Sequence, residues 1–518
     1  MMTTSEFRVL LVYPNLMFQT MFPMGLALLS SVLKGAGYKV DSFDTTFYRT
    51  DIKAPHEYQI ENLQMKPLGE SFERALRQVE RPAEAMIPDF RAKVESFQPD
   101  LIAVSAVEDT FRLAVDLLDG VSDLGIPNII GGVFPTFAPE KAIREKNVNM
   151  ICVGEGEYAL LELCEALSKG RDHSNVRNLW VKKRNGDVVR NAIRGTVSLD
   201  ELPRPDYALF DNSRFYFTTK SQGRLLNSGS VETARGCPYR CSFCNSPSQV
   251  DLYNSTNAGY FFRLKSVQRV YEELKDLKEN HNVDYIHFPA DTFLAIPDAY
   301  LHELAEAYKS INLPFWCQTR SETLTEERVR ILEDMGCQNV SVGLEHGNED
   351  FRRRVVRRDY TNKDFVEKFK LLEGASFNIT VNNIIGLPME DRKLTWDTIY
   401  LDRKVQHVLH TINAFHFVPY HGTPLRDVAV KEGFISDNSR VEHNLKDTII
   451  NMPRYTRDEI RGAVRTFTMY VRFPESEFPR IQQAERMDER GDAVFRELQQ
   501  EFVDKYFKGN PIEIPSTT

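Results

Sequence analysis

Three cysteines lie close together in the run ARGCPYRCSFCNSP, namely Cys237, Cys241 and Cys244. Their spacing is C-x3-C-x2-C, and three thiolates suit a cubane [4Fe–4S] cluster that leaves one iron without a protein ligand. Zinc is the main alternative, but a structural zinc site uses a fourth cysteine or histidine at short spacing. The next such residues along the chain are distant, at His281 and Cys317. The segment therefore favours an iron–sulfur cluster whose open iron can bind another molecule.

The other cysteines do not form a pattern. They are Cys152, Cys164, Cys317 and Cys337, and the total of seven is an odd number in a long chain. Such usage is not typical of a disulfide framework. We expect these four residues to be small, buried and apolar in character, as unpaired cysteines commonly are.

Composition limits the class of protein. The chain has 518 residues and a formal net charge of -9. This length predicts two or three domains. The acidic balance argues against nucleic acid as the main ligand, because nucleic-acid binders need a basic footprint. No apolar run is long enough for a transmembrane segment, and the polar N-terminus lacks the basic start and cleavage site of a signal peptide. We therefore expect a cytoplasmic protein.

The cysteine loop must be positioned by the elements around it, and the first of these form a separate unit over residues 1–170. Apolar strand patterns alternate there with helical patterns, which predicts a flavodoxin-like (Rossmann-type) α/β domain with a parallel sheet covered on both faces. Ligands of such sheets bind beyond the carboxyl ends of the strands. The expected strands are Arg8–Tyr13, Tyr38–Phe43, Leu101–Ser105, Asn128–Gly131 and Met150–Val153, with helices at Gly25–Leu33 and Phe111–Leu124 and a helical insertion at 45–95.

Residues 171–227 are predicted to be a linker, with a hairpin turn at Asn185-Gly186 and an extended stretch at Glu201–Asp206. Residues 228–430 then show six strand–helix units, which predict a partial (β/α)6 barrel with its chemistry at the carboxyl ends of the strands. The expected strands are Ser228–Thr233, Tyr285–Phe288, Phe315–Gln318, Asn339–Val342, Ile379–Ile385 and Ala414–Phe417. Residues 431–518 are charged and predicted to be mainly helical, with breaks at Pro474 and Pro479.

The cysteine loop directly follows the first barrel strand, and Phe243 precedes its last cysteine. This arrangement resembles the radical S-adenosylmethionine superfamily. The resemblance implies that the open iron binds S-adenosylmethionine, and that one-electron reduction cleaves this cosubstrate to a 5′-deoxyadenosyl radical. It also implies an electron donor such as flavodoxin or ferredoxin.

Later segments of the barrel resemble the same superfamily in order and spacing. Arg320, in QTRSE, resembles the polar residue near the cosubstrate, and Glu345, in VGLEHG, resembles a residue that contacts it. Ile385 and Gly386, in IIGLPME, resemble the loop whose backbone meets the adenine. The remaining matches are FPADTF, which contains Asp291, and PYHGTPL, which contains Tyr420 and His421. Asp291, Tyr420 and His421 are the candidate catalytic residues, with equal standing as binders of substrate or cosubstrate.

The domain that precedes the barrel resembles those of cobalamin-binding radical S-adenosylmethionine proteins, class B methyltransferases among them. The matching segments are PMGLALLSSVL, the Gly131-Gly132 pair, VGEGE and ELPRPD. A flavodoxin-like domain that has lost its cofactor, or binds a nucleotide, is the alternative. No G-x-G-x-x-G follows the first strand, which argues against a dinucleotide.

The classical cobalamin motif D-x-H-x-x-G is missing. The loop Tyr13–Gly25 contains no histidine, and the first histidine of the chain is His56. The resemblance therefore implies a cobalamin without a histidine lower ligand. Strand-end positions give the expected cobalamin-binding residues: Asn15, Gln19, Ser105, Val107, Glu108, Gly131, Gly132, Val133, Thr136, Gly154, Glu155 and Gly156.

The leading hypothesis for function is radical methylation of an unactivated carbon in a small-molecule or natural-product substrate, with cobalamin as the methyl donor. A cyclase, rearrangement or oxidation enzyme with the same cofactors is the alternative, and a cobalamin- or redox-sensing binding protein is a third reading. Methylthiolation of tRNA is disfavoured, because only Cys152 and Cys164 lie in the first domain, too few for a second cluster. The substrate pocket is expected to involve residues 45–95 and 431–518.

Overall fold

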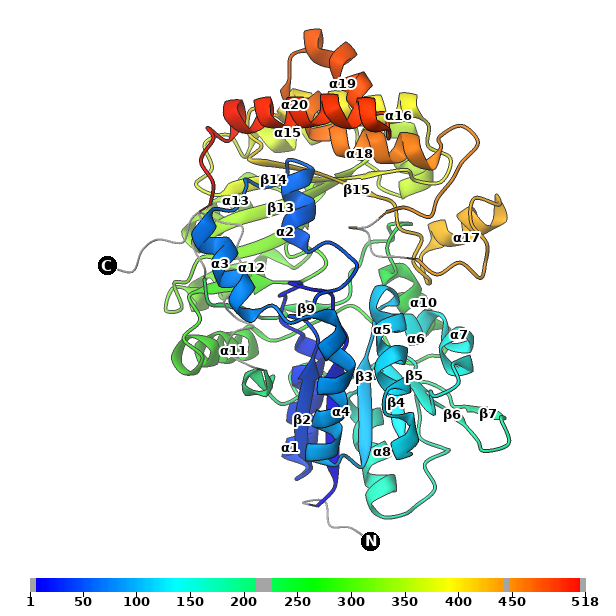
Figure 1. Ribbon diagram of the computed structural model, residues 1–518. Coiled ribbons are helices and arrows are strands. Elements are labelled where there is room, and N and C mark those ends of the chain that lie inside the picture. The colour runs from blue at the N-terminus through cyan, green and yellow to red at the C-terminus, as the bar shows by residue number, and fades with distance from the viewer. Residues whose placement is uncertain (1–5, 211–225, 442–444, 446, 513–518) are drawn as a thin grey trace.

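The computed structural model describes residues 6–210, 226–441, 445 and 447–512. Part of the predicted linker, residues 211–225, and parts of the predicted C-terminal region, 442–444, 446 and 513–518, lie outside the described residues. The two large units are visible in Figure 1, with the first sheet at one end of the molecule and the barrel at the other. Within the described residues, no helix has both the length and the apolar character needed to cross a bilayer.

The first unit is built on a seven-stranded sheet of order β2-β1-β3-β4-β5-β6-β7. β1 to β5 run parallel to one another, and their apolar residues pack beneath helices on both faces. The strands are β1 Arg8–Tyr13, β2 Lys39–Asp44, β3 Leu101–Ser105, β4 Asn128–Gly131, β5 Met150–Cys152, β6 Leu179–Lys182 and β7 Val188–Arg190. The helices are α1 Met24–Gly35, α2 Pro55–Glu61, α3 Glu70–Val79, α4 Met86–Phe97, α5 Glu108–Asp119, α6 Val133–Phe137, α7 Pro139–Arg144 and α8 Glu157–Ser168. The predicted doubly wound domain is confirmed.

One boundary differs from the expectation. The predicted turn at Asn185-Gly186 does join a hairpin, but its strands β6 and β7 extend the first sheet in antiparallel fashion. The first sheet therefore continues past residue 170. Its β6 strand pairs with β5 and covers an edge that would otherwise be open.

The second unit is a six-stranded parallel sheet of order β15-β14-β13-β12-β11-β8, with a short ribbon β9-β10 beside it. The strands are β8 Ser228–Ser230, β9 Ala234–Arg235, β10 Arg263–Leu264, β11 Tyr285–Phe288, β12 Phe315–Arg320, β13 Cys337–Glu345, β14 Asn378–Ile385 and β15 Thr411–His416. The helices are α10 Ser246–Ser255, α11 Val267–Asn280, α12 Asp298–Tyr308, α13 Glu326–Asp334, α14 Glu349–Phe351, α15 Asn362–Lys370, α16 Arg392–Val405 and α17 Pro424–Lys431. The predicted partial barrel is confirmed.

The C-terminal region is helical, as predicted, with α18 Arg457–Arg472, α19 Phe478–Ala484 and α20 Glu489–Tyr506. Pro474 lies in the break after α18, whereas Pro479 lies in the first turn of α19, where a missing backbone N–H costs nothing. α18 packs on α16 and β15, which closes one side of the barrel (Figure 1).

The insertion at 45–95 reaches from the first unit to the barrel. The Tyr58 ring stacks on that of Phe415 with 6.2 Å between centroids, and Gln64 Nε2 donates to the Ala414 carbonyl over 3.1 Å. Both partners are on β15, the edge strand of the barrel. The insertion therefore covers the barrel beside the strand where the partial sheet ends.

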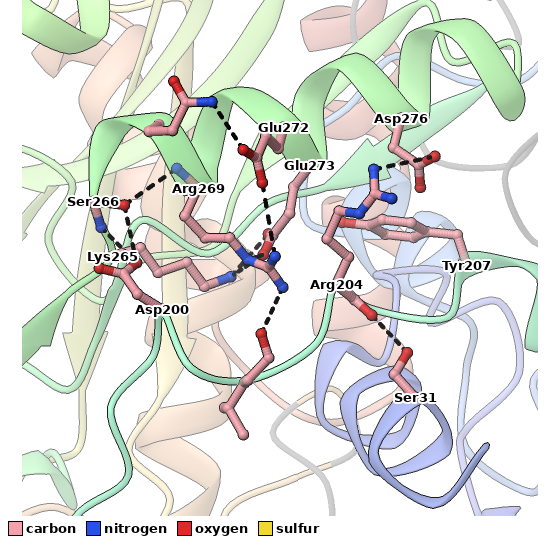
Figure 2. A network of polar contacts seen from close by, with 12 residues as sticks. Ser31, Asp200, Arg204, Tyr207, Lys265, Ser266, Arg269, Glu272, Glu273 and Asp276 are labelled. Carbon is pink, nitrogen blue, oxygen red and sulfur yellow. Dashed lines mark hydrogen bonds and ion pairs between the residues drawn. The ribbon is translucent and has the colours of Figure 1, made fainter. Parts of the chain in front are cut away.

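Hydrogen bonds hold the connection between the two units to each of them (Figure 2). Asp200 accepts from the backbone N–H of Ser266 at 2.8 Å, at the start of α11. Ser31, on α1, donates to the Arg204 carbonyl over 2.6 Å. Beneath this stretch, Lys265 forms a fully buried ion pair with Glu273 at 2.8 Å. These contacts tie the predicted ELPRPD boundary to both units.

Candidate functional site

The three cysteines follow β9 on one loop at the barrel mouth. Cys237 and Cys241 are buried and Cys244 is partly buried. Burial raises the pKa of the Cys237 thiol and raises that of Cys244 to about 12. Thiols of this kind ionise when a metal replaces the proton.

The donor set fits a cluster better than a single ion. Among the described residues, no three His, Cys, Asp or Glu side chains are grouped closely enough for one metal ion. A cubane places each of its cysteines on a different iron, so it does not need that grouping. The buried Arg320 donates from Nη1 to Cys241 Sγ over 2.8 Å, and a cation at this position suits a cluster of thiolates.

Arg320 and Glu345 are both buried near this loop, at the ends of β12 and β13. Glu345 Oε1 pairs with Arg358 Nη2 at 3.0 Å. Burial raises the pKa of the Glu345 carboxyl, and Arg358 opposes that change. Arg358 also lies over the ring of Phe243, 5.6 Å from its centroid. The predicted residues Phe243, Arg320 and Glu345 therefore gather around the cysteine loop, together with Arg358, which the motifs did not indicate.

The pairing of Glu345 with Arg358 requires a glycine at position 343. A Cβ there would lie 2.2 Å from Glu345 Oε1 and 3.1 Å from Arg358 Nη1. Glu345 itself has a positive φ of 67°, a conformation that costs a non-glycine residue energy and often marks a functional position.

The loop after β14 is held by Glu390. Its Oε2 accepts from the backbone N–H groups of Gly386 at 2.7 Å and Leu387 at 2.9 Å, and Ile385 is fully buried. Because the Gly386 N–H already has a partner, the predicted adenine contact at Ile385 and Gly386 would involve other backbone atoms. That contact stays a prediction.

A cavity of about 350 Å³ lies at the carboxyl edge of the first sheet. Eight of the predicted cobalamin-binding residues line it: Ser105, Gly131, Gly132, Val133, Thr136, Gly154, Glu155 and Gly156. Its wall also includes residues that the sequence did not indicate, among them Glu157, Glu232, Arg235, Gln249 and Phe261. Cavities for drug-sized ligands measure roughly 300–1,000 Å³, so this one admits part of a cofactor as large as cobalamin.

The cavity wall fits an apolar, close-packed ligand face. No histidine is among its lining residues. Gly132 has a φ of 112°, and a Cβ there would come within 2.4 Å of the Ala106 carbonyl oxygen, so only glycine fits. These features agree with a cobalamin that has no histidine ligand, which stays a prediction.

Four predicted cobalamin-binding residues lie away from this cavity. Asn15 is buried in its own loop, where Nδ2 donates to the Gln19 carbonyl over 2.7 Å. Val107 is exposed, and Glu108 is turned toward the barrel. Strand-end position placed all four residues near the sheet edge, but loop backbone directs their side chains elsewhere. A role for them in cobalamin binding is therefore not supported by this cavity.

Charged residues join the cavity to the cysteine loop. Glu155 Oε1 accepts from Arg235 Nη1 at 2.7 Å and also pairs with Arg263, while Arg235 pairs with Glu157 at 2.8 Å. The two arginines face each other in the β9-β10 ribbon. Arg235 precedes Cys237 by two residues. One buried ionic network thus belongs to both sites.

The candidate catalytic residues Tyr420 and His421 bridge the two units. The Tyr420 hydroxyl donates to Asp109 Oδ2 over 2.9 Å. His421 Nδ1 lies 2.8 Å from Glu108 Oε1, and its backbone N–H donates to Glu108 Oε2 over 2.8 Å. These bonds are positioning contacts between the units.

Asp291 lies nearer the cysteines. It is solvent-accessible in the crowded barrel mouth, and desolvation there raises the pKa of its carboxyl. Its charge also raises the pKa of the Cys237 thiol, which places the two groups within electrostatic reach. The role of Asp291 stays a prediction.

Each of the two units matches a known protein family. Residues 17–164 match the B12 binding domain, and residues 231–399 match the radical SAM superfamily. An uncharacterized methyltransferase of Pyrococcus horikoshii is 27% identical over 386 residues, which span 73% of this chain and 79% of the relative. The cytidylyl-2-hydroxyethylphosphonate methyltransferase of Streptomyces wedmorensis is 23% identical and aligns over 83% of this chain and 82% of its own.

A solved structure shares the fold of the whole chain. The radical S-adenosylmethionine methyltransferase TsrM from Kitasatospora setae, solved with cobalamin and a [4Fe–4S] cluster, superposes with a TM-score of 0.63 at 16% identity. The match covers 95% of this chain and 99% of that one. The two domains and the cysteine loop define a radical S-adenosylmethionine enzyme with a cobalamin domain. The chain belongs to the cobalamin-binding radical S-adenosylmethionine family, whose cofactors are a [4Fe–4S] cluster, S-adenosylmethionine and cobalamin.

Proposed function

We propose that this enzyme transfers a methyl group to an unactivated carbon of a small organic molecule. The observation that carries the proposal is the shared ionic network of Glu155 and Arg235, which places the cavity of the first sheet against the cysteine loop. Chemistry that combines both cofactors needs such a shared boundary. The similar methyltransferases support the same reaction class.

Cys237, Cys241 and Cys244 would hold the cluster, and the cavity residues would hold part of the cobalamin. When bound, the cluster with S-adenosylmethionine supplies hydrogen abstraction from carbon, and the cobalamin supplies the methyl group. The chain supplies charge balance and position. Arg320 complements the thiolates, and Arg358 keeps the Glu345 carboxylate oriented at the end of β13.

The contacts of Tyr420 and His421 fix the angle between the units. Each bonds a carboxylate at the start of α5, directly after β3. These contacts hold the barrel mouth at a fixed distance from the edge of the first sheet. A fixed distance favours reaction, because misplacement of reacting groups by about 1 Å costs on the order of 100-fold in rate. We propose that these two residues act through position, while Asp291, beside the cysteines, contacts substrate or cosubstrate.

The test uses the anaerobic, cluster-reconstituted enzyme with S-adenosylmethionine and a reductant, with and without added cobalamin. The proposal expects 5′-deoxyadenosine in both samples and S-adenosylhomocysteine only where cobalamin is present. Formation of 5′-deoxyadenosine without S-adenosylhomocysteine would favour cyclisation, rearrangement or oxidation. The absence of both products would favour a sensing or binding role.

We also propose a cytoplasmic setting and reduction by flavodoxin or ferredoxin. The superfamily reaction consumes an electron that the chain itself does not generate. An external carrier is therefore part of the proposed function.

A further inference from the structure

Five arginines fall within seven residues, 352–358, in a chain whose net charge is -9. Two of them point inward. Arg352 is fully buried and bonds the carbonyl groups of His346 and Tyr360, and Arg358 holds Glu345. The other three, Arg353, Arg354 and Arg357, are exposed, and the reaction described above gives them no role.

This segment is bonded to the cysteine loop through its backbone. Residues Arg352–Val356 form a π-helical turn, a rare conformation that is frequent at functional sites. Ser242, which lies between Cys241 and Cys244, donates its backbone N–H to the Val356 carbonyl over 3.1 Å. Its hydroxyl donates to the Val355 carbonyl. The exposed arginines therefore stand on the outer surface of the segment that supports the cluster loop.

Two of these cations are uncompensated. In the part of the chain that the structure describes, Arg354 and Arg357 form no ion pair with a carboxylate, and Arg354 bonds only the Asp350 carbonyl. Arg353 pairs with Asp359 at 3.0 Å, but both side chains are exposed, so water and salt screen this pair.

The cysteine loop itself carries one further exposed cation. Arg240 lies next to Cys241 in the sequence and is exposed, with Asp251 as its partner at 2.7 Å. Exposed ion pairs of this kind are weak, so an incoming anionic surface can compete for the arginine.

We propose that Arg240, Arg353, Arg354 and Arg357 form the docking surface for a small, acidic one-electron carrier protein. The inference rests on the proposed function, because the reaction draws an external electron. In the step, the carrier is oxidised by one electron and the cluster is reduced by one, with no bond made or broken. Charge complementarity favours this partner, since transient redox complexes are small and steered by opposite charges.

The test compares cluster reduction in wild-type protein and in the double variant Arg354→Glu and Arg357→Glu. The matched control is Lys183→Glu with Arg184→Glu, which changes net charge equally at the exposed tip of the β6-β7 hairpin. Loss of the visible absorption of the cluster gives the rate, at low and high salt. Reduced flavodoxin and reduced ferredoxin serve as carriers in parallel arms, and dithionite serves as the small reductant.

We expect at least one carrier to reduce the wild-type cluster, more slowly at high salt. In the double variant, the rate of cluster reduction by that carrier should fall by about 10-fold or more at low salt, which is within the range of rate changes that electrostatic steering produces. Its rate with dithionite, and the control variant with either reductant, should change little.

The proposal would be overturned if neither carrier reduces the wild-type cluster, if the carrier rate is unaltered in the double variant, or if the control variant is slowed equally. Equal slowing with dithionite would show damage to the cluster loop, and would overturn it too. Because no methyl transfer is measured, failure of the methylation proposal leaves this test intact.

Discussion

Glu155 and Arg235 form a buried ion pair with 2.7 Å between Oε1 and Nη1. Glu155 belongs to the wall of the cavity in the first sheet, and Arg235 stands two residues before Cys237. Glu155 is a predicted cobalamin contact, and in the structure it also links the cavity to the strand that leads into the cysteine loop. Its backbone is held as well, because the Glu155 N–H donates a hydrogen bond to the Tyr253 hydroxyl oxygen over 2.9 Å.

Substitution Glu155→Gln should destabilise the protein and loosen cobalamin retention together. Breaking a buried ion pair from one side costs about 3–5 kcal/mol, and Glu157 can offset part of this by its contact with Arg235. We expect a loss of about 2–4 kcal/mol in the free energy of unfolding, measured by denaturant titration of the cofactor-free protein.

The matched control is Glu140→Gln, which breaks the exposed pair between Glu140 and Arg190. That change should cost less than about 1 kcal/mol. Equal effects of the two substitutions would contradict a special role for the buried pair.

Replacing any one of Cys237, Cys241 and Cys244 by alanine should abolish the visible absorption of the cluster and the formation of 5′-deoxyadenosine. The physical reason is the loss of one of three thiolates that hold separate irons. The control is Cys164→Ala, which removes a fully buried thiol in α8 and should leave the cluster spectrum unchanged. A normal spectrum in a variant of the three-cysteine loop would refute the ligand assignment.

Gly343→Ala tests the geometry of Glu345. The added Cβ would collide with Glu345 Oε1 at 2.2 Å and force the carboxylate away from Arg358. We expect the KM for S-adenosylmethionine to rise about 10-fold or more, which corresponds to about 1.4 kcal/mol of binding. Gly35→Ala, where a Cβ meets open space, is the control and should leave KM unaltered. An unchanged KM in Gly343→Ala would argue against a cosubstrate contact by Glu345.

Asp109 makes stability depend on pH. Burial raises the pKa of its carboxyl to about 7, although Tyr420 donates a hydrogen bond to it. Between about pH 4 and 7 the folded protein keeps a proton that the unfolded chain has lost, so stability falls as pH rises and levels off above the folded pKa.

The variant Asp109→Asn cannot ionise and still accepts from Tyr420. It should be more stable than wild type at pH 8 by about 2–4 kcal/mol and similar to it near pH 4. Unfolding midpoints measured across this range provide the check. Parallel pH profiles for the two proteins would contradict the assignment.

The sequence predicted the strands and helices well, because the buried parallel strands are continuous apolar runs and each barrel helix has a clear amphipathic period. The cysteine loop was equally readable, since its ligands are local. Long-range partners were not: Glu108 and His421 are 313 residues apart, and no pattern in either segment indicates their 2.8 Å contact. The motifs did not indicate Arg358 for the same reason, although five arginines within seven residues are an unusual feature of the sequence.

Strand-end position also has a limit as a predictor. It identified eight lining residues of the cavity, where glycines bring backbone to the wall. Asn15 and Val107 do not line this cavity, because a residue after a strand can turn its side chain into its own loop or into solvent. The direction of a loop side chain depends on backbone angles that apolar periodicity does not encode.

The most direct test of methyl transfer follows the methyl group itself. Reduced enzyme with both cofactors is supplied with S-adenosylmethionine deuterated on its methyl, and with a small-molecule extract from cells that lack the enzyme. We predict a new product that is heavier by the full methyl label than its counterpart from unlabelled cosubstrate, and that is absent with Cys241→Ala. A product that forms at equal mass from labelled and unlabelled cosubstrate would contradict this prediction.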